Sequence, residues 1–285
     1  MLRLRGLPAF EVEQSGRMRP GLAARIILHE QYDSDHGRMG DLAGDRIRLR
    51  YKKIGKAGYI SHLDMMAVIR RALLRAGLEL EYSEGFNPHP YISVAIPAPV
   101  GVESECELAD VDLAVNVQAS LIPGMLAPVL PEGVEALEAY APGRKFGEIA
   151  WMRLRGRLLY DREAPYGAEQ RLTERIAAGG LIAGKKTKRG EERIDVAPFL
   201  RDVTFHAGGK ADMIAGTGSN AGGIVSAPSN DYAEVEIQAT VSAQNPSVSP
   251  SLLVGALSSG DVSLKPVFSK FTRTEFFDRE FSPFR

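Results

Sequence analysis

Hydrophobic and polar residues alternate in the run RIRLRYKKIG, which occupies positions 46–55. In an extended chain Ile47, Leu49 and Tyr51 fall on one face, while basic residues fall on the other. The pattern predicts a half-buried strand with a basic outer face.

The apolar spacing then lengthens to three or four residues, which predicts an amphipathic helix over 62–76. Ser61 and Asp64 resemble a capping box in which Asp replaces the usual Glu, and a glycine follows the last turn. Arg71 and Arg75 are four residues apart, so they share an outer face of this helix.

Five further segments complete the first half of the chain. Extended segments are expected at 78–83, 91–96 and 105–117, followed by a short helix at 121–130 and a strand at 133–140. With the two extended segments around the GFNPHP loop, 78–83 and 91–96, counted as one element, the order is β, α, β, β, α, β. This order favours an antiparallel sheet with both helices on one face, the ferredoxin-like arrangement.

The second half repeats this order without detectable sequence identity to the first. Its expected elements are strands at 149–160, 185–196, 203–205, 233–241 and 263–276, and helices at 166–178 and 249–257. We therefore predict an α+β protein made of two tandem ferredoxin-like modules with antiparallel sheets.

The expected boundaries follow from composition. A glycine-rich leader with poor periodicity covers 1–44, the first module covers 45–141 and the second covers 148–277. Glycine and small polar residues at 207–231 predict a hairpin insertion in the second module.

The segment YSEGFNPHPYISVAIPAPVG, at 82–101, carries the densest turn chemistry of the chain. Its prolines fix φ and push the residues before them toward extended backbone, so we expect a stiff loop. Gly85, Phe86, Asn87 and His89 are therefore candidate binding residues, because a stiff loop loses little entropy on binding. We expect this loop and the capped start of the basic helix to form one binding site, to which the helix contributes Ser61, His62, Asp64, Arg71 and Arg75. The alternative is a connection whose His and Asn satisfy only backbone groups.

Charge is divided unevenly along the first module. Positions 46–75 hold nine Lys or Arg and one acid, whereas 101–140 hold eight acids and no Lys or Arg. A second basic cluster comprises Lys185, Lys186, Lys188, Arg189 and Arg193. If the basic elements face one groove they form a track for a phosphate backbone, with Phe86 and Tyr91 available for base stacking. The alternative is that both clusters are ordinary solvated faces.

His62 and His89 are the candidate catalytic residues. Ser61, His62 and Asp64 are too close in sequence to form a nucleophile, base and orienter chain, and the helix cap explains Ser61 and Asp64 better. The two histidines could act as general acid and base in metal-independent RNA cleavage if both reached one phosphate. A His, His, Asp metal site is a weaker alternative, and we assign no metal ligands.

Composition narrows the class of protein. The 285 residues have a formal net charge of −1, so any nucleic-acid site must rest on local patches. The single cysteine excludes an internal disulfide and a multi-cysteine iron–sulfur site within this sequence. No apolar stretch approaches the length of a membrane span, and no signal peptide is evident, so we expect a cytoplasmic protein without a membrane partner.

The segments SHLD, YSEGFNPHP and PAPVGVES, with the surrounding sequence from Arg46 to Val117, resemble the radical-SAM-linked protein family of bacteria. The similarity is looser through KKTKRGEERIDV. Members occur beside, or fused to, B12-binding radical SAM proteins. The resemblance implies such a protein as partner and a link to tRNA or ribosome maturation. It also implies that the iron–sulfur cluster, SAM and cobalamin are bound by the partner and none by this chain.

Three functions are compatible with these observations. The first is a non-catalytic accessory protein that binds RNA or another anionic substrate for a radical SAM enzyme. The second is a metal-independent RNA-processing endonuclease that uses His62 or His89. The third is a protein-interaction scaffold.

Overall fold

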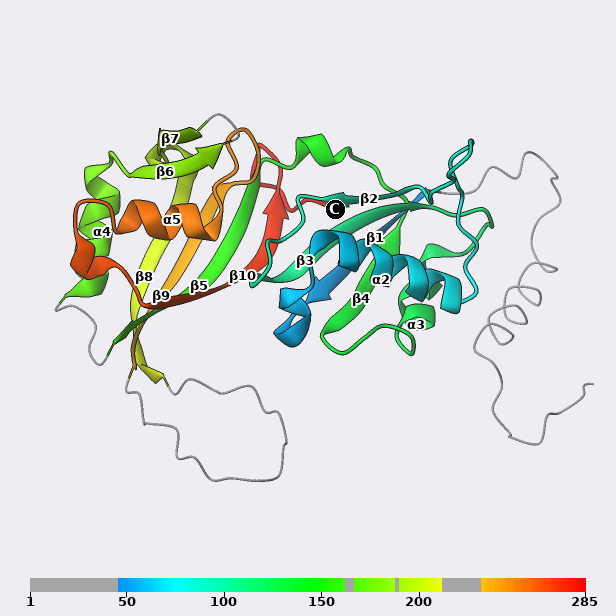
Figure 1. The fold of residues 1–285 in the computed structure, drawn as a ribbon, viewed down its shortest axis with the longest axis horizontal. Helices are drawn as coiled ribbons and strands as arrows, with labels where there is room; N and C mark the ends of the chain where they lie inside the picture. Colours follow the sequence, from blue (N-terminus) through cyan, green and yellow to red (C-terminus); the bar gives the residue numbers. More distant parts are fainter. Residues whose placement is uncertain (1–45, 162–166, 188–189, 212–231) are drawn as a thin grey trace, which may run out of the picture.

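The computed structural model describes residues 46–161, 167–187, 190–211 and 232–285. The leader expected at 1–44 therefore lies outside the described residues. Within the described part, four α-helices accompany one eight-stranded sheet and one two-stranded sheet (Figure 1). The protein is thus a mixed α+β protein.

The first half follows the expected order of elements. The strands are β1 (Arg46–Lys53), β2 (Ile92–Ala95), β3 (Glu103–Asp112) and β4 (Val134–Tyr140), and the helices are α2 (His62–Arg75) and α3 (Ile122–Leu126). β1 lies between β3 and β4 and is antiparallel to both, while β2 pairs with β3. The apolar face of α2 packs into a core formed with β1 and β3.

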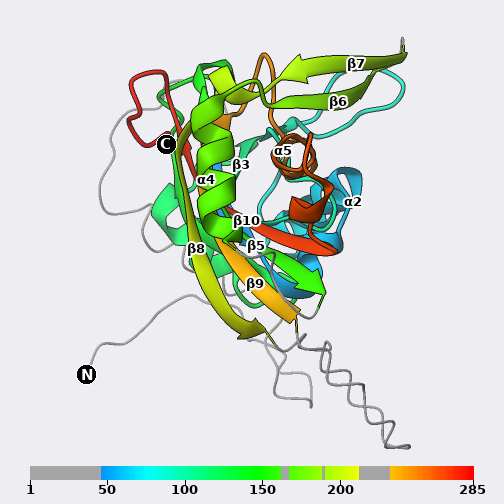
Figure 2. The same cartoon turned by 90° about the vertical axis from the view of Figure 1, so that its left-hand side faces the viewer.

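The second half holds six strands and two helices. The strands are β5 (Trp151–Asp161), β6 (Ile182–Thr187), β7 (Gly190–Asp195), β8 (Leu200–Ala211), β9 (Tyr232–Ser242) and β10 (Phe268–Phe277), and the helices are α4 (Ala168–Ala178) and α5 (Pro250–Leu257). Its part of the main sheet has the order β10-β5-β9-β8. α4 packs against β8, and α5 lies below the β6–β7 hairpin (Figures 1 and 2).

The expectation of antiparallel sheets is wrong at the junction of the two halves. β3 and β10 pair in parallel, with Glu103 opposite Thr272 and Ser104 opposite Arg273, so the two halves share one mixed sheet. β3 has two neighbours on the edge that faces away from β1. β10 pairs with the first residues of β3, and β2 pairs with its later residues. The two halves are therefore joined by backbone pairing between β3 and β10.

Three expected elements differ from the structure. Residues 78–83 contribute only isolated bridges instead of a strand, with Leu80 opposite Leu113, just beyond β3, and Tyr82 opposite Pro90. The segment 185–196 is a hairpin of β6 and β7, since Gly190 turns the chain with a φ of 131°. The helix expected over 121–130 is limited to the single turn of α3.

The first residues of the hairpin insertion expected at 207–231 belong to a strand. Residues 207–211 are part of β8, and 212–231 lie outside the described residues. Gly208 is needed within this strand, because a Cβ there would lie 2.9 Å from Glu234 on the neighbouring β9. Gly208 therefore allows β8 and β9 to pack closely. The composition of this segment had predicted a loop instead.

Residues 278–285 follow β10 and return to the first half. Phe284 is fully buried, with the guanidinium of Arg144 4.5 Å and that of Arg48 5.3 Å from its ring centroid. Arg144 also forms a 2.6 Å ion pair with Asp278. This segment therefore covers the buried side chain of Arg48 on β1 and places Phe284 in the core of the second half.

Candidate functional site

The predicted stiff loop is a hairpin tip, residues 82–91, that projects from the edge of β3. Ser83 and His89 close it, because the backbone N–H of Ser83 donates to the carbonyl of His89 at 2.9 Å. The Ser83 hydroxyl in turn accepts the backbone N–H of His89 at 3.1 Å and lies 2.9 Å from its Nδ1. When the hydroxyl donates its proton to Nδ1, the neutral imidazole carries its proton on Nε2, which is left available to a ligand.

Aromatic side chains are displayed on this hairpin tip. Phe86 is wholly exposed, and Tyr82 and Tyr91 are exposed by 42% and 45%. Gly85, which has a φ of 117°, provides the backbone conformation that presents Phe86 at the apex. Asn87 is also exposed, so its amide adds a polar group beside the ring.

The predicted start of α2 is confirmed. The Ser61 hydroxyl accepts the backbone N–H of Asp64 at 3.3 Å and donates to its carboxylate at 2.7 Å. Both side chains are thus engaged in the helix cap. His62 follows as the first residue of the helix and is partly buried.

The hairpin tip and the helix cap lie apart and do not form one site. This arrangement contradicts the hypothesis that His62 and His89 act together as general acid and base. The hairpin tip lies next to Asp112, which pairs with Arg46 at the first residue of β1, whereas the cap follows the last residue of β1. The eight residues of β1 span about 25 Å, so the two histidines lie at opposite ends of this strand. They cannot contact the same phosphate.

Arg71 and Arg75 are exposed on the outer face of α2, as the pattern predicts. Arg75 donates to the carbonyl of Val129 at 3.4 Å, and among the described residues neither arginine forms an ion pair. α2 ends near the edge of β3 from which the hairpin tip projects (Figure 1). Cations and exposed rings therefore occur at the same end of the first half.

The basic face expected for β1 is not available as a phosphate track. Arg46 pairs with Asp112 at 2.6 Å, and Arg48, which is buried, pairs with Asp110 at 2.7 Å. Two further pairs extend the series, Arg50 with Glu138 at 3.3 Å and Lys52 with Glu135 at 2.6 Å. The basic and acidic segments of the first half thus neutralise each other across neighbouring strands.

The second basic cluster is only partly described. Lys185 and Lys186 lie in β6, where the strand register sets them opposite Glu192 and Glu191. Lys188 and Arg189 lie outside the described residues. The β6–β7 hairpin and the hairpin tip project toward the same side of the molecule, one from each half (Figures 1 and 2).

A buried polar cluster at the junction was not predicted from the sequence. Arg273 forms an ion pair with Glu107, and both side chains are 3% exposed. Arg273 also donates to the carbonyl of Ile96 at 2.6 Å and to the Ser104 hydroxyl at 3.2 Å. Burial lowers the pKa of neighbouring Lys53, whose ammonium contacts only backbone carbonyls among the described residues.

Among the described residues, no group of three or more His, Cys, Asp or Glu side chains is arranged to hold a metal ion. In the same part of the chain, no helix has the length and apolar character required to cross a membrane.

These observations define a mixed α+β protein with an exposed aromatic hairpin tip. Residues 46–244 match the model of a family described as "Uncharacterized protein conserved in bacteria (DUF2344)", and the chain belongs to this family. No curated protein matches the chain.

Two solved structures show only distant similarity. An unknown protein from Galdieria sulphuraria is 10% identical, with 69% of this chain and 81% of that one covered and a TM-score of 0.19. A dye-decolorizing protein from V. cholerae is 8% identical, with 81% and 92% covered and a TM-score of 0.18.

Proposed function

We propose that this protein is a non-catalytic accessory protein that binds RNA, or another anionic substrate, for a B12-binding radical SAM protein. The observation that carries the proposal is the hairpin tip, where Phe86, Tyr82 and Tyr91 are exposed on a loop closed by Ser83 and His89. Unpaired bases stack on such rings whatever their sequence, and stacking contributes about 1–3 kcal/mol per base.

The charge distribution limits where an RNA backbone could bind. Arg46, Arg48, Arg50 and Lys52 of β1 are already paired with carboxylates. In the first half we therefore assign the phosphate contacts to Arg71 and Arg75, which are exposed on α2. In the second half we assign this role to the β6–β7 cluster of Lys185, Lys186, Lys188 and Arg189. The projection of both hairpins toward one side supports a substrate that spans the two halves (Figures 1 and 2).

The fold is part of the proposal. We infer that each half is a ferredoxin-like module. The strand order β4-β1-β3 with β2 on β3, and the order β10-β5-β9-β8, support this relationship. In this interpretation β6 and β7 are an insertion between the first helix and second strand of the second module.

A separate catalytic partner is consistent with the chemistry of this chain. A radical SAM cluster needs several cysteine thiolates, and the only cysteine of the sequence, Cys106, is buried. We therefore assign the iron–sulfur cluster, SAM and cobalamin to the partner. We propose that the reaction of this partner serves tRNA or ribosome maturation. The endonuclease alternative is weakened because His62 and His89 lie at opposite ends of β1.

Fluorescence anisotropy with a labelled single-stranded RNA of about 12 nucleotides tests the binding function. We expect salt-dependent binding that Phe86→Ala weakens about fivefold or more, because one stacked base is lost. Phe268→Ala is the matched control, since Phe268 is 48% exposed but lies on β10. Arg71→Gln should weaken binding and reduce its salt dependence.

Affinity capture from a cognate bacterial lysate, with and without nuclease, tests the partner. We expect a radical SAM protein in both samples and RNA only in the untreated sample. Absence of both RNA binding and partner association would remove the proposal. If the partner binds, RNA does not, and charge reversal at Lys185, Lys186 and Arg189 has no effect, the protein is a scaffold.

A further inference from the structure

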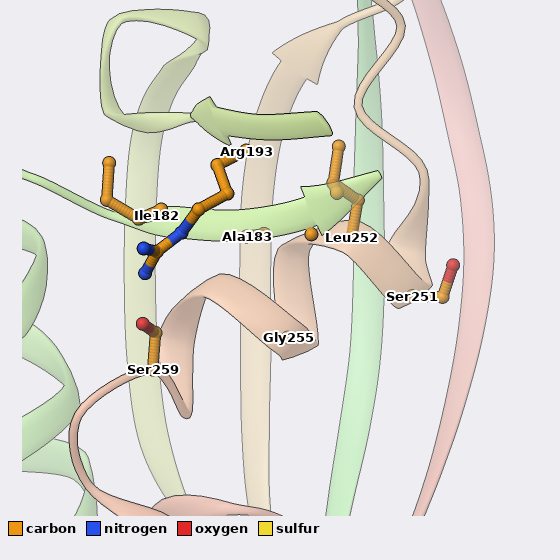
Figure 3. Close-up of a pocket in the computed structure, with 8 residues that line it drawn as sticks. Ile182, Ala183, Arg193, Ser251, Leu252, Gly255 and Ser259 are labelled. Carbon is orange, nitrogen blue, oxygen red and sulfur yellow. The ribbon is translucent and has the colours of Figure 1, made fainter. Parts of the chain in front are cut away.

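A pocket of about 520 Å³ lies in the second half, between the β6–β7 hairpin and α5 (Figure 3). Ile182, Ala183 and Leu252 contribute apolar surface, while Arg193 and Ser259 contribute polar groups. This volume is in the range of small-molecule sites, which combine an apolar wall with a few polar groups that fix orientation. The pocket is distinct from the hairpin tip at 82–91.

Arg193 extends from β7 past β6, and its guanidinium points toward the hydroxyl of Ser259 (Figure 3). Among the described residues, Arg193 forms no ion pair and no hydrogen bond, and neither does the Ser259 hydroxyl. Two unused donors therefore converge at one end of the pocket. They have the chemistry to bind an oxyanion, because the guanidinium presents a fork of N–H groups that matches two oxygens.

The guanidinium of Arg175 lies beside Gly260, which follows Ser259 in the turn after α5. A terminal nitrogen of Arg175, Nη2, is 3.7 Å from the position that a Cβ on Gly260 would occupy. Its Nε is buried without a hydrogen-bond partner. The turn after α5 is thus flanked by Arg193 from β7 and Arg175 from α4, and neither is paired with a carboxylate among the described residues.

The alternative role for Arg193 is to neutralise the partial negative charge at the C-terminal end of α5. The carbonyls there already have donors, because the Ser258 hydroxyl donates to Val254 at 2.9 Å and the Ser259 N–H donates to Ala256 at 3.2 Å. Arg193 donates to neither carbonyl. Its guanidinium therefore remains available to a ligand.

The centre of the pocket has room for an apolar group. Gly255 lines it, and a Cβ on this residue would meet no atom within 4 Å. Ala183 and Leu252 lie alongside. A ligand with its anion at Arg193 could place a ring or short alkyl group over Gly255.

We propose that this pocket binds a small phosphate monoester with an apolar substituent. Arg193 and the Ser259 hydroxyl bind the phosphate, Arg175 adds positive charge to the same turn, and the surface around Gly255 takes the apolar substituent. A phosphate is favoured over a carboxylate because two guanidinium groups balance its two negative charges.

Isothermal titration of the full chain with phenyl phosphate, phenol and benzoate tests the proposal. We expect saturable one-to-one binding of phenyl phosphate, weaker binding of benzoate and none of phenol. Arg193→Gln should weaken phenyl phosphate binding about tenfold or more, since a charged hydrogen bond is lost. Arg279→Gln is the matched control, because Arg279 is exposed and has no ion pair among the described residues.

Gly255→Leu provides an independent test of the apolar part. Leucine favours a helix more than glycine does, so folding should be retained while the side chain fills the pocket and blocks phenyl phosphate. Circular dichroism confirms folding of each variant. The proposal is overturned if the wild-type protein does not bind phenyl phosphate, if benzoate binds more tightly, or if both folded variants bind phenyl phosphate as the wild type does.

Discussion

Replacing Arg273 with methionine should strongly destabilise the protein. The change leaves Glu107 buried without its guanidinium partner and removes the hydrogen bonds to Ile96 and Ser104. Breaking a buried ion pair from one side costs about 3–5 kcal/mol. Lys53 provides a second positive charge near Glu107, so we expect the lower end, about 3 kcal/mol, out of a total of roughly 5–15 kcal/mol.

Urea unfolding followed by circular dichroism and by the fluorescence of Trp151, the single tryptophan, measures this loss. Arg155→Met is the matched control, because Arg155 lies on the adjacent strand and forms an exposed 3.1 Å pair with Glu105. We expect it to cost less than about 1 kcal/mol.

The double variant Arg273→Met, Glu107→Leu separates the lost pair from lost packing. Removing both charges should recover much of the stability, since the cost arises from the unpaired carboxylate. The reasoning is refuted if Arg273→Met costs no more than the Arg155 control, or if the double variant is less stable than Arg273→Met alone.

Three further predictions concern buried groups. Burial raises the pKa of the Cys106 thiol to about 11, so Ellman's reagent at pH 8 should label the native protein about a hundredfold more slowly than the urea-unfolded chain; equal rates would contradict this. Burial lowers the pKa of Lys53 in the folded protein. At pH values between the folded and the unfolded pKa, the unfolded chain binds more protons than the folded one, so the free energy of unfolding rises with pH. Lys53→Met should lose that rise in urea titrations at pH values just below 10.5, the ordinary lysine pKa, and parallel curves for the two proteins would exclude it. Gly156→Ala should cost about 1–3 kcal/mol in urea unfolding, because its Cβ would lie 2.4 Å from the Phe271 ring, whereas Gly124→Ala, with open space, should not.

Local features were the most predictable part of this fold. α2 was predicted within a residue because its cap, its apolar period and its terminal glycine all lie within the helix or next to it. The closure of the loop near His89 also depends on residues close in sequence, because Ser83 and His89 hydrogen-bond to each other. Such signals act over a few residues and can be identified in sequence.

Features that depend on distant residues could not be predicted. The charges of β1 indicated a basic face, but the partners of Arg46 and Arg48 lie more than 60 residues away and cancel that charge. The pair of Arg273 with Glu107 spans 166 residues. For the same reason, the placement of His62 and His89 at opposite ends of β1 follows only from strand register.

The return of residues 278–285 to the first half has a consequence for biosynthesis. Phe284 completes the packing around Arg48, yet it is synthesised more than 230 residues after it. The core of the first half contains only residues of that half, so it can form during translation, but Arg48 on the opposite face of β1 stays without its Phe284 contact until residues 278–285 have left the ribosome. A nascent chain stalled before β10 should therefore expose the edge of β3 to chaperones and to other chains.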